Sequence, residues 1–352
     1  MTLGMGARPW AGLDIGAWSV KLVVLHPGAG PVFRAGTPGR YAEAAIPRAL
    51  AGEDPPAPAI LAGLIDDCMT RIGIPARRYG GISIGVSGPD VIVKQIALPI
   101  MDESEIAGAL RFEARKHLPF DPQTLVLDHE VIGRNTAERR LDVLLATVSQ
   151  QRLDRSLAPL RELGIEAAIV DAAPLALANA LGHSLARESP ADGEARLLLD
   201  LGHRASWLTL RQKALPFFSR RLDWGGARLG ESVAAACNGA QDLAEAWKLD
   251  SASSLAHETP EALAARHAVG QLADEVRRSL AFYATIAPLP ASLSLHVSGG
   301  TARIAGVCET LAQRLGLTVT SFSPLDGVER GVRVHAGGPQ FAQAYGLALR
   351  AA

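Results

Sequence analysis

Two short segments of the sequence place an aspartate and a glycine between apolar runs. Residues 12–25 read GLDIGAWSVKLVVL, and residues 199–210 read LDLGHRASWLTL. A strand that ends in Asp-x-Gly and turns tightly directs backbone N–H groups toward a ligand, where they can bind phosphate oxygens. A single such turn is also typical of a surface hairpin. Its repetition in both halves of the chain favours two related domains that hold one polyphosphate between them.

Three further features extend this phosphate chemistry. Asp14 and Asp200 would lie near the magnesium ion of a nucleotide, and would contact it through water because Mg²⁺ gives up its hydration shell reluctantly. Lys21 would add a positive charge, although a strand-edge lysine is as often simply solvated. In VSGGTARIAG, residues 297–306, Gly299 and Gly300 leave room for a ligand between a strand and a helix, but such glycines are also common as structural turns.

The elements that position these residues follow from hydrophobic periodicity. Apolar residues at helical spacing predict a helix from Ile60 to Ile72 that stops at Gly73, and ISIGV at 82–86 predicts a strand. A second helix is expected from Asp102 to Leu118, and a third carries a stripe from Leu272 to Tyr283. The chain of 352 residues, 48% of them apolar and 20% charged, is long enough for two domains with large cores. The fold class expected is α/β.

Composition excludes several partners. The net charge of −1 and the lack of a basic patch argue against nucleic acid and anionic membranes. The three cysteines, which are far apart, argue against a disulfide framework or a zinc knuckle. The sequence shows neither a signal-peptide core nor a run of about 18 apolar residues, which predicts a cytoplasmic location.

In their order and spacing, the three glycine segments resemble the nucleotide-binding loops of the actin, Hsp70 and sugar-kinase superfamily. The resemblance implies an actin-like (ribonuclease H-like) two-domain fold that binds ATP and Mg²⁺ in its cleft. It implies three loops: the first phosphate loop with Asp14, Gly16, Ala17, Trp18, Ser19 and Lys21; the second with Asp200, Gly202, His203 and Arg204; and the adenosine loop with Gly299, Gly300 and Arg303.

The loops depart from the superfamily pattern in their hydroxyl groups. Ala17 stands where a small hydroxyl residue is usual, and His203 and Arg204 replace small residues and threonines. Fewer hydroxyl donors predict weak ATP binding and at most slow hydrolysis. Asp171 is the one carboxylate considered for orienting a water molecule, and its alternative role is to cap the following helix.

Residues 93–132, VKQIALPIMDESEIAGALRFEARKHLPFDPQTLVLDHEVI, resemble the PilM family of cytoplasmic actin-like proteins in type IV pilus assembly. That resemblance implies a nucleotide-binding scaffold that binds the N-terminal cytoplasmic peptide of a PilN-like inner-membrane protein, is recruited to the membrane by it, and meets other platform and motor proteins. The residues implied in peptide binding are Arg111, Phe112, Arg115, Pro119 and Phe120. The alternative for Phe112 is that it belongs to the core.

The resemblance also implies a division of the chain. One actin-like domain would comprise 10–87 and 167–190, with an inserted subdomain at 88–166; the other would comprise 194–225 and 290–350, with a helical subdomain at 226–289. Alternative functions are a small-molecule kinase and an FtsA-like or GspL-like membrane-complex component. A kinase needs a catalytic aspartate in a substrate cleft, whereas the other two are expected to carry a membrane helix or span.

Overall fold

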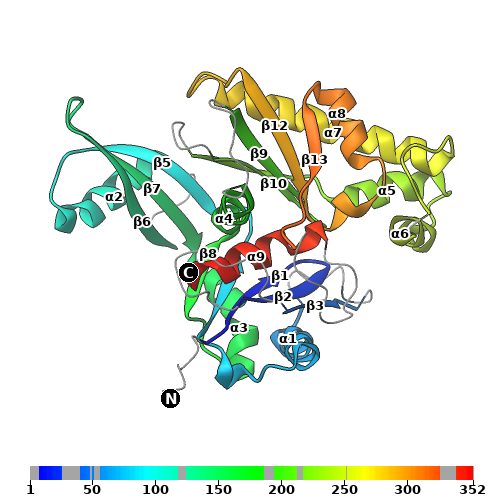
Figure 1. Cartoon of the computed structure of the whole chain (residues 1–352), viewed down its shortest axis with the longest axis horizontal. Helices are drawn as coiled ribbons and strands as arrows, with labels where there is room; N and C mark the ends of the chain where they lie inside the picture. The colour runs from blue at the N-terminus through cyan, green and yellow to red at the C-terminus, as the bar shows by residue number, and fades with distance from the viewer. Residues whose placement is uncertain are drawn as a thin grey trace, which may run out of the picture.

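Two five-stranded sheets with the same strand order form most of the computed structural model (Figure 1). The structure describes residues 8–25, 40–47, 50, 56–117, 124–185, 194–211, 217–250, 252–325 and 338–351. The first sheet has the order β3-β2-β1-β4-β8 and the second β11-β10-β9-β12-β13. The first contains β1 (Trp10–Ile15), β2 (Ser19–Leu25), β3 (Arg40–Ala45), β4 (Gly81–Val86) and β8 (Ile169–Ala172); the second contains β9 (Glu194–Leu201), β10 (Ser206–Arg211), β11 (Phe218–Leu222), β12 (Ser292–Ser298) and β13 (Thr318–Ser321).

Strand directions also agree between the two sheets. β1 pairs antiparallel with β2 and parallel with β4, and β9 likewise pairs antiparallel with β10 and parallel with β12. Each Asp-x-Gly segment therefore forms the turn of a hairpin at the same place in its sheet. The predicted duplication of this hairpin is confirmed.

A third sheet, β5-β7-β6, lies beside the two large ones. It consists of β5 (Ile92–Pro99), β6 (Leu125–Asn135) and β7 (Arg140–Ser149), and α2 (Glu103–His117) packs on it. Ile106 and Leu110 of α2 are buried against a core of Ile96, Leu98, Leu141, Val143 and Leu145. Glu105 accepts a hydrogen bond from the Asp102 N–H, as expected for the start of this helix.

The two connections of this third sheet to the rest of the chain meet at Asp90. The carboxylate of Asp90 accepts hydrogen bonds from the Ser149 hydroxyl and from the Arg152 guanidinium, and the Ser149 N–H lies 3.3 Å away. Burial opposes the charged form of Asp90, but these bonds outweigh it and lower its pKa. The third sheet also contacts the second, because the Ser219 hydroxyl donates to the Val93 carbonyl at 3.3 Å.

Helices α1 (Pro58–Ile72) and α3 (Gln150–Glu162) pack on the first sheet. α1 ends at Gly73, which has a φ of 71°, as its sequence predicts. Leu160 of α3 lies in the same core as Ile65 of α1 and Leu22 of β2. Because α3 contributes to the first domain's core, we propose that the inserted subdomain spans 88–149 rather than 88–166.

Two further helices, α4 (Ala173–Leu185) and α9 (Ala342–Ala348), lie between the two large sheets and pack on each other (Figure 1). α9 approaches β1 and α4 so closely that a Cβ atom at Gly346 would lie 1.8 Å from the Ala176 carbonyl oxygen. A Cβ atom at Gly12 would lie 2.0 Å from the Ala344 carbonyl oxygen. Glycine is therefore required at both contacts.

The second sheet is covered by helices from the C-terminal half. The predicted stripe of α7 is confirmed, since Leu272, Val276 and Tyr283 are buried there.

Among the described residues, no helix combines the length and apolar character needed to cross a bilayer. The helices that cover the second sheet are α5 (Gly226–Ala236), α6 (Gln241–Leu249), α7 (Pro260–Tyr283) and α8 (Val307–Leu315); single 3₁₀ turns lie at Ala76–Arg78, Gly300–Arg303, Pro339–Phe341 and Leu349–Ala351.

Candidate functional site

A cleft of about 620 Å³ opens between the two hairpin turns. Every residue that the sequence assigns to the nucleotide lines it: Asp14, Gly16, Ala17, Trp18, Ser19, Lys21, Asp200, Gly202, His203, Arg204, Gly299, Gly300 and Arg303. Three loops that are far apart in the sequence thus meet at one site.

The first turn is held closed by its own backbone. The Gly16 N–H donates to the Ser19 carbonyl at 3.0 Å, and the Trp18 carbonyl accepts from the Ile46 N–H at 2.9 Å. A Cβ atom at Gly16 would lie 3.1 Å from the Ser19 oxygen and 3.3 Å from Lys21 Nζ. The glycine therefore lets the chain pass close to the lysine at the base of the turn.

Asp14 uses both carboxylate oxygens in contacts within the protein. Its Oδ2 lies 3.2 Å from Lys21 Nζ, and its Oδ1 accepts from Gln343 Nε2 at 2.8 Å. Burial of Lys21 works against its charge, but the carboxylates of Asp14 and Glu43 outweigh this and raise its pKa. Lys21 is therefore a buried, charged residue of the cleft, and its interpretation as a solvated strand-edge lysine is wrong.

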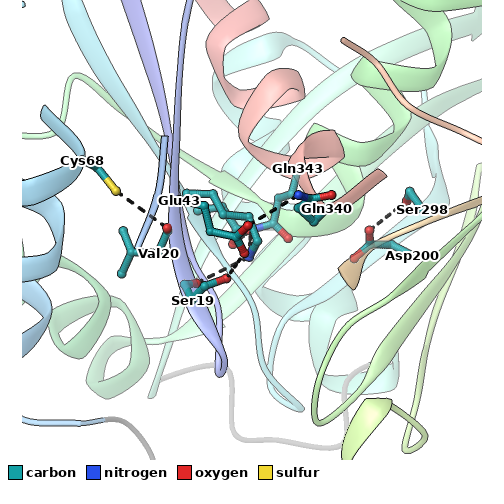
Figure 2. Close-up of polar contacts among 10 residues, drawn as sticks. Ser19, Val20, Glu43, Cys68, Asp200, Ser298, Gln340 and Gln343 are labelled. Atoms are coloured by element: carbon teal, nitrogen blue, oxygen red, sulfur yellow. Dashed lines mark hydrogen bonds and ion pairs between the residues drawn. The ribbon is translucent and has the colours of Figure 1, made fainter. Parts of the chain in front are cut away.

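Glu43 on β3 is a cleft residue that sequence reasoning missed. It accepts a hydrogen bond from the Ser19 hydroxyl at 2.6 Å, and Gln340 Nε2 lies 3.4 Å from its other oxygen. Figure 2 shows Ser19, Glu43, Gln340 and Gln343 gathered on one side of the cleft. The signal that could have revealed the glutamines is their spacing of three residues within the apolar segment PQFAQAYGLALR, which places both on one helix face.

The second turn is fixed from outside by the start of α5. The Gly226 N–H donates to the Gly202 carbonyl at 2.9 Å, and the Ala227 N–H donates to the His203 carbonyl at 2.8 Å. A Cβ atom at Gly202 would lie only 2.5 Å from the Ala205 oxygen. This turn is thus as tightly bent as the first.

Asp200 lies across the cleft from the first turn. Within the described part of the chain, it forms no salt bridge like that between Asp14 and Lys21. It accepts a hydrogen bond from the Ser298 hydroxyl at 2.8 Å (Figure 2). Burial raises the pKa of Asp200 to about 6; the Ser298 bond and Lys21 oppose this shift, and the negative charge of Asp14 adds to it. The two aspartates are therefore close enough to repel each other.

The third loop contacts the second directly. Gly299 has a φ of 91°, and a Cβ atom there would lie 2.4 Å from the Leu201 oxygen. The Thr301 hydroxyl donates to the Gly202 carbonyl at 3.3 Å. Glycine is needed here for its backbone conformation as well as for space.

An aromatic contact joins the first and second turns across the cleft. The rings of Trp18 and His203 have centroids 5.0 Å apart, and Lys248 Nζ lies 5.7 Å from the Trp18 ring centroid. Burial, assisted by the charge of Lys248, lowers the pKa of His203 to about 4. His203 is therefore neutral near pH 7.

The family model for the type IV pilus assembly protein PilM matches residues 12–352. The chain belongs to the PilM family. Its fold matches a PilM structure in a PilM–PilN type IV pilus biogenesis complex with a TM-score of 0.78 and 28% identity over 97% of each chain. Two more distant structures share the fold. Ethanolamine utilization protein EutJ from Carboxydothermus hydrogenoformans has a TM-score of 0.52 and 15% identity over 97% of this chain and 89% of its own. Component A of the Acidaminococcus fermentans (R)-2-hydroxyglutaryl-CoA dehydratase has a TM-score of 0.50 and 12% identity over 97% of each chain.

These matches confirm the expected actin-like α/β fold and a role in type IV pilus biogenesis. In this PilM-family chain the cleft is formed by the duplicated hairpins of that fold. Among the described residues, no group of three or more His, Cys, Asp and Glu side chains is arranged to hold a metal ion.

The candidate catalytic residue of this PilM-family chain, Asp171, is not among the residues that line the cleft. It lies on β8, where its Oδ2 is 3.2 Å from Arg350 Nε. Burial raises its pKa, Arg350 opposes that shift, and Asp128 of β6 adds to it. This position supports a structural ion pair rather than the orientation of a water molecule in the cleft.

Three of the five residues expected to bind a partner lie on α2 of this PilM-family chain: Arg111, Phe112 and Arg115. Phe112 is 63% exposed, so the alternative that it belongs to the core is wrong. Arg111 precedes it and is also exposed. Arg115 lies in the last turn of α2, and Pro119 and Phe120 lie outside the described residues.

Proposed function

We propose that this PilM-family protein is a cytoplasmic scaffold that binds Mg-ATP in the cleft and the N-terminal peptide of a PilN-like inner-membrane protein on its inserted subdomain. The observation that carries the first part is the convergence of three glycine loops around Lys21, Asp14 and Asp200. The similarity to a PilM–PilN complex supports the second part. Further contacts with pilus platform and motor proteins would follow from such a scaffold role.

The residues present fit a magnesium nucleotide. Gly16, Gly202 and Gly299 stand where a Cβ atom would meet neighbouring backbone, so the loops bend tightly enough to turn N–H groups toward an anion. Lys21 would hold a phosphate as a point charge. Because both oxygens of Asp14 already accept contacts, this aspartate would reach a hydrated ion through water, with Asp200 on the opposite side. When bound, the ion would neutralise phosphate charge.

The same geometry favours a binding protein over a small-molecule kinase. The Ser19 hydroxyl donates its hydrogen bond to Glu43, so it is not available to a phosphate oxygen. Glu43 in turn lies at the base of the first turn, engaged by Ser19 and Gln340. Asp171 lies away from the cleft lining. Because Glu43 is engaged by Ser19 and Gln340, and Asp171 is not part of the cleft lining, neither carboxylate is positioned as a general base. We therefore expect hydrolysis to be slow at most.

The inserted subdomain supplies the surface proposed for the peptide. α2 buries Ile106 and Leu110 against the third sheet and leaves Phe112 exposed on another face. The exposed arginine beside it could pair with an acidic peptide group or a peptide carbonyl. A few such anchor residues can supply micromolar affinity.

Isothermal titration tests the nucleotide site. We expect wild type to bind Mg-ATP and Asp200→Ala to bind it at least about tenfold more weakly, because the cation loses one of its two carboxylates. Asp66→Ala, which removes an exposed carboxylate on α1, is the matched control and should bind as wild type does. Equal affinity in the first two proteins would contradict the role of Asp200. Rapid phosphorylation of a small molecule would instead favour a kinase.

A separate titration tests the peptide site, with a synthetic peptide from the N-terminus of the inner-membrane protein encoded beside this chain. Phe112→Ala and Arg111→Glu should both weaken binding without lowering the melting temperature, since both positions are exposed. Leu243→Ala, at a position that is 62% exposed on α6, is the control for loss of a surface apolar group. Unchanged binding by both α2 variants would refute the assignment.

A further inference from the structure

The contact between Trp18 and His203 lies where the two phosphate loops approach each other. Trp18 belongs to the turn between β1 and β2, and His203 to the turn between β9 and β10. Their ring centroids are 5.0 Å apart, and both residues line the cleft. The two halves of the molecule therefore touch through side chains at the point where a phosphate chain would have to be held by both loops.

Neither loop is positioned to move aside easily. The Trp18 carbonyl is held by the Ile46 N–H at 2.9 Å, and the His203 carbonyl is held by the Ala227 N–H at 2.8 Å. Both backbones are thus anchored to their own domains. The contact can open by rotation of the two side chains or by separation of the two domains.

A third side chain stabilises the indole in this position. Lys248 Nζ lies 5.7 Å from the Trp18 ring centroid, donates to the Gly226 carbonyl at 3.0 Å and pairs with Glu245. An ammonium group over an indole face is attractive. Trp18 therefore has favourable neighbours from the second turn and from α6.

On the basis of the proposed nucleotide site, we propose that Trp18 and His203 form a specificity pair that disfavours long phosphate chains. A triphosphate held by both turns must lie between their N–H groups, so it has to displace the ring contact. Adenosine held near Gly299 and Gly300 does not. Displacing the ring contact lowers the affinity for ATP most, the affinity for ADP less and the affinity for adenosine not at all. The pair therefore reduces the advantage in affinity that the extra phosphates would otherwise give to ATP and ADP over adenosine.

The test is titration of adenosine, Mg-ADP and Mg-ATP into wild type, Trp18→Ala, His203→Ala and the double variant. Trp18→Ala should raise the affinity for Mg-ATP about three- to tenfold, the range expected for losing one aromatic contact, and should raise that for Mg-ADP less. Adenosine affinity should stay the same and serves as the control within each variant. The double variant should gain no more than the better single variant, because both changes remove the same contact.

Each outcome decides the proposal. An ATP-to-adenosine affinity ratio that is unchanged in Trp18→Ala overturns the specificity pair and leaves the nucleotide site intact. A lower ratio shows that Trp18 assists phosphate binding, which also overturns it. If no ligand binds to any of the four proteins, and thermal melts show that they are folded, both the nucleotide site and the specificity pair fail.

Discussion

The first and second hairpin turns lie at equivalent places in their sheets, yet they hold their aspartates in different electrostatic environments. Asp14 contacts a buried lysine and a glutamine from α9. Asp200 accepts a hydrogen bond from a serine hydroxyl, and burial raises its pKa to about 6. The sheet order on either side is the same. The duplicated topology therefore places each turn at the same point of its sheet. The side chains around each turn determine how readily its aspartate is charged.

The two helices between the sheets show a related difference. α9 reaches the first sheet and α4 through glycines, with Gly12 and Gly346 at positions where a Cβ atom would meet a carbonyl oxygen. α4 packs near the second sheet through larger apolar residues, such as Leu177 in a core with Leu198. The contacts of α9 are therefore more sensitive to added volume than the contact of α4 with the second sheet.

The largest effect should come from Gly346→Ala. The new methyl group would lie 1.8 Å from the Ala176 oxygen, so α9 and α4 must separate. We expect a loss of at least about 4 kcal/mol in the free energy of unfolding, measured by urea denaturation. Gly63→Ala, on α1 with nothing within 4 Å of the new methyl group, is the control and should stabilise by about 0.5–1 kcal/mol. Similar results for both variants would contradict the close packing of α9.

Lys21→Met should have the next largest effect. It leaves the Asp14 carboxylate buried without its cation, which costs about 3 kcal/mol in the free energy of unfolding. Adding Asp14→Asn should recover much of this loss, because the double variant buries no unpaired charge. Denaturant curves at pH 7.5 measure both. Equal stability of the single and double variants would show that the ion pair does not contribute as proposed.

Asp200→Asn should raise the free energy of unfolding, whereas Gly346→Ala and Lys21→Met lower it. The folded-state pKa of Asp200, about 6, is above the ordinary value of about 3.9, so the free energy of unfolding of wild type falls as pH rises from about 4 to 6. Asparagine removes this loss. The variant should be more stable than wild type by about 2 kcal/mol at pH 7.5, and the difference should vanish near pH 4. A difference that does not change with pH would contradict the raised pKa.

The smallest effect is expected from removing a single tryptophan hydrogen bond. One such bond joins the two halves of the molecule, and another lies within the first half. Trp207 Nε1 donates to the Ser87 hydroxyl at 3.1 Å, and Trp10 Nε1 donates to the Ser83 hydroxyl at 2.8 Å within the first sheet. Trp207→Phe and Trp10→Phe should each lower the free energy of unfolding by about 1 kcal/mol. A much larger loss for Trp207→Phe would indicate that the halves are held together chiefly at this point.

Much of this arrangement could be predicted from local sequence. A turn that needs glycine depends on a few neighbouring residues, so the loops at Gly16, Gly202 and Gly299 were identifiable, as was the duplicated hairpin. The α2 start and the α1 end were predictable for the same reason. The assignment of the cleft residues to a nucleotide stays a prediction.

The remaining features depend on contacts between distant segments. Gln343 is 329 positions from Asp14, and no motif marks Glu43 in its strand. The contact of Trp18 with His203 requires the relative placement of two domains, which no single segment encodes. The proposed end of the inserted subdomain at residue 149 also depends on distant contacts, because α3 follows β7 directly in sequence but packs into another core.

The junction at Asp90 has an evolutionary consequence. Because the chain leaves the first domain and returns to it at one carboxylate, the segment between these points can be lengthened, exchanged or lost without moving the ends of the host. A fold with such a junction can acquire a new recognition module as a single cassette while its cleft stays the same. Replacing residues 92–147 with a short linker would reproduce that event in the laboratory, because it leaves Val91 and Val148 in the core of the host.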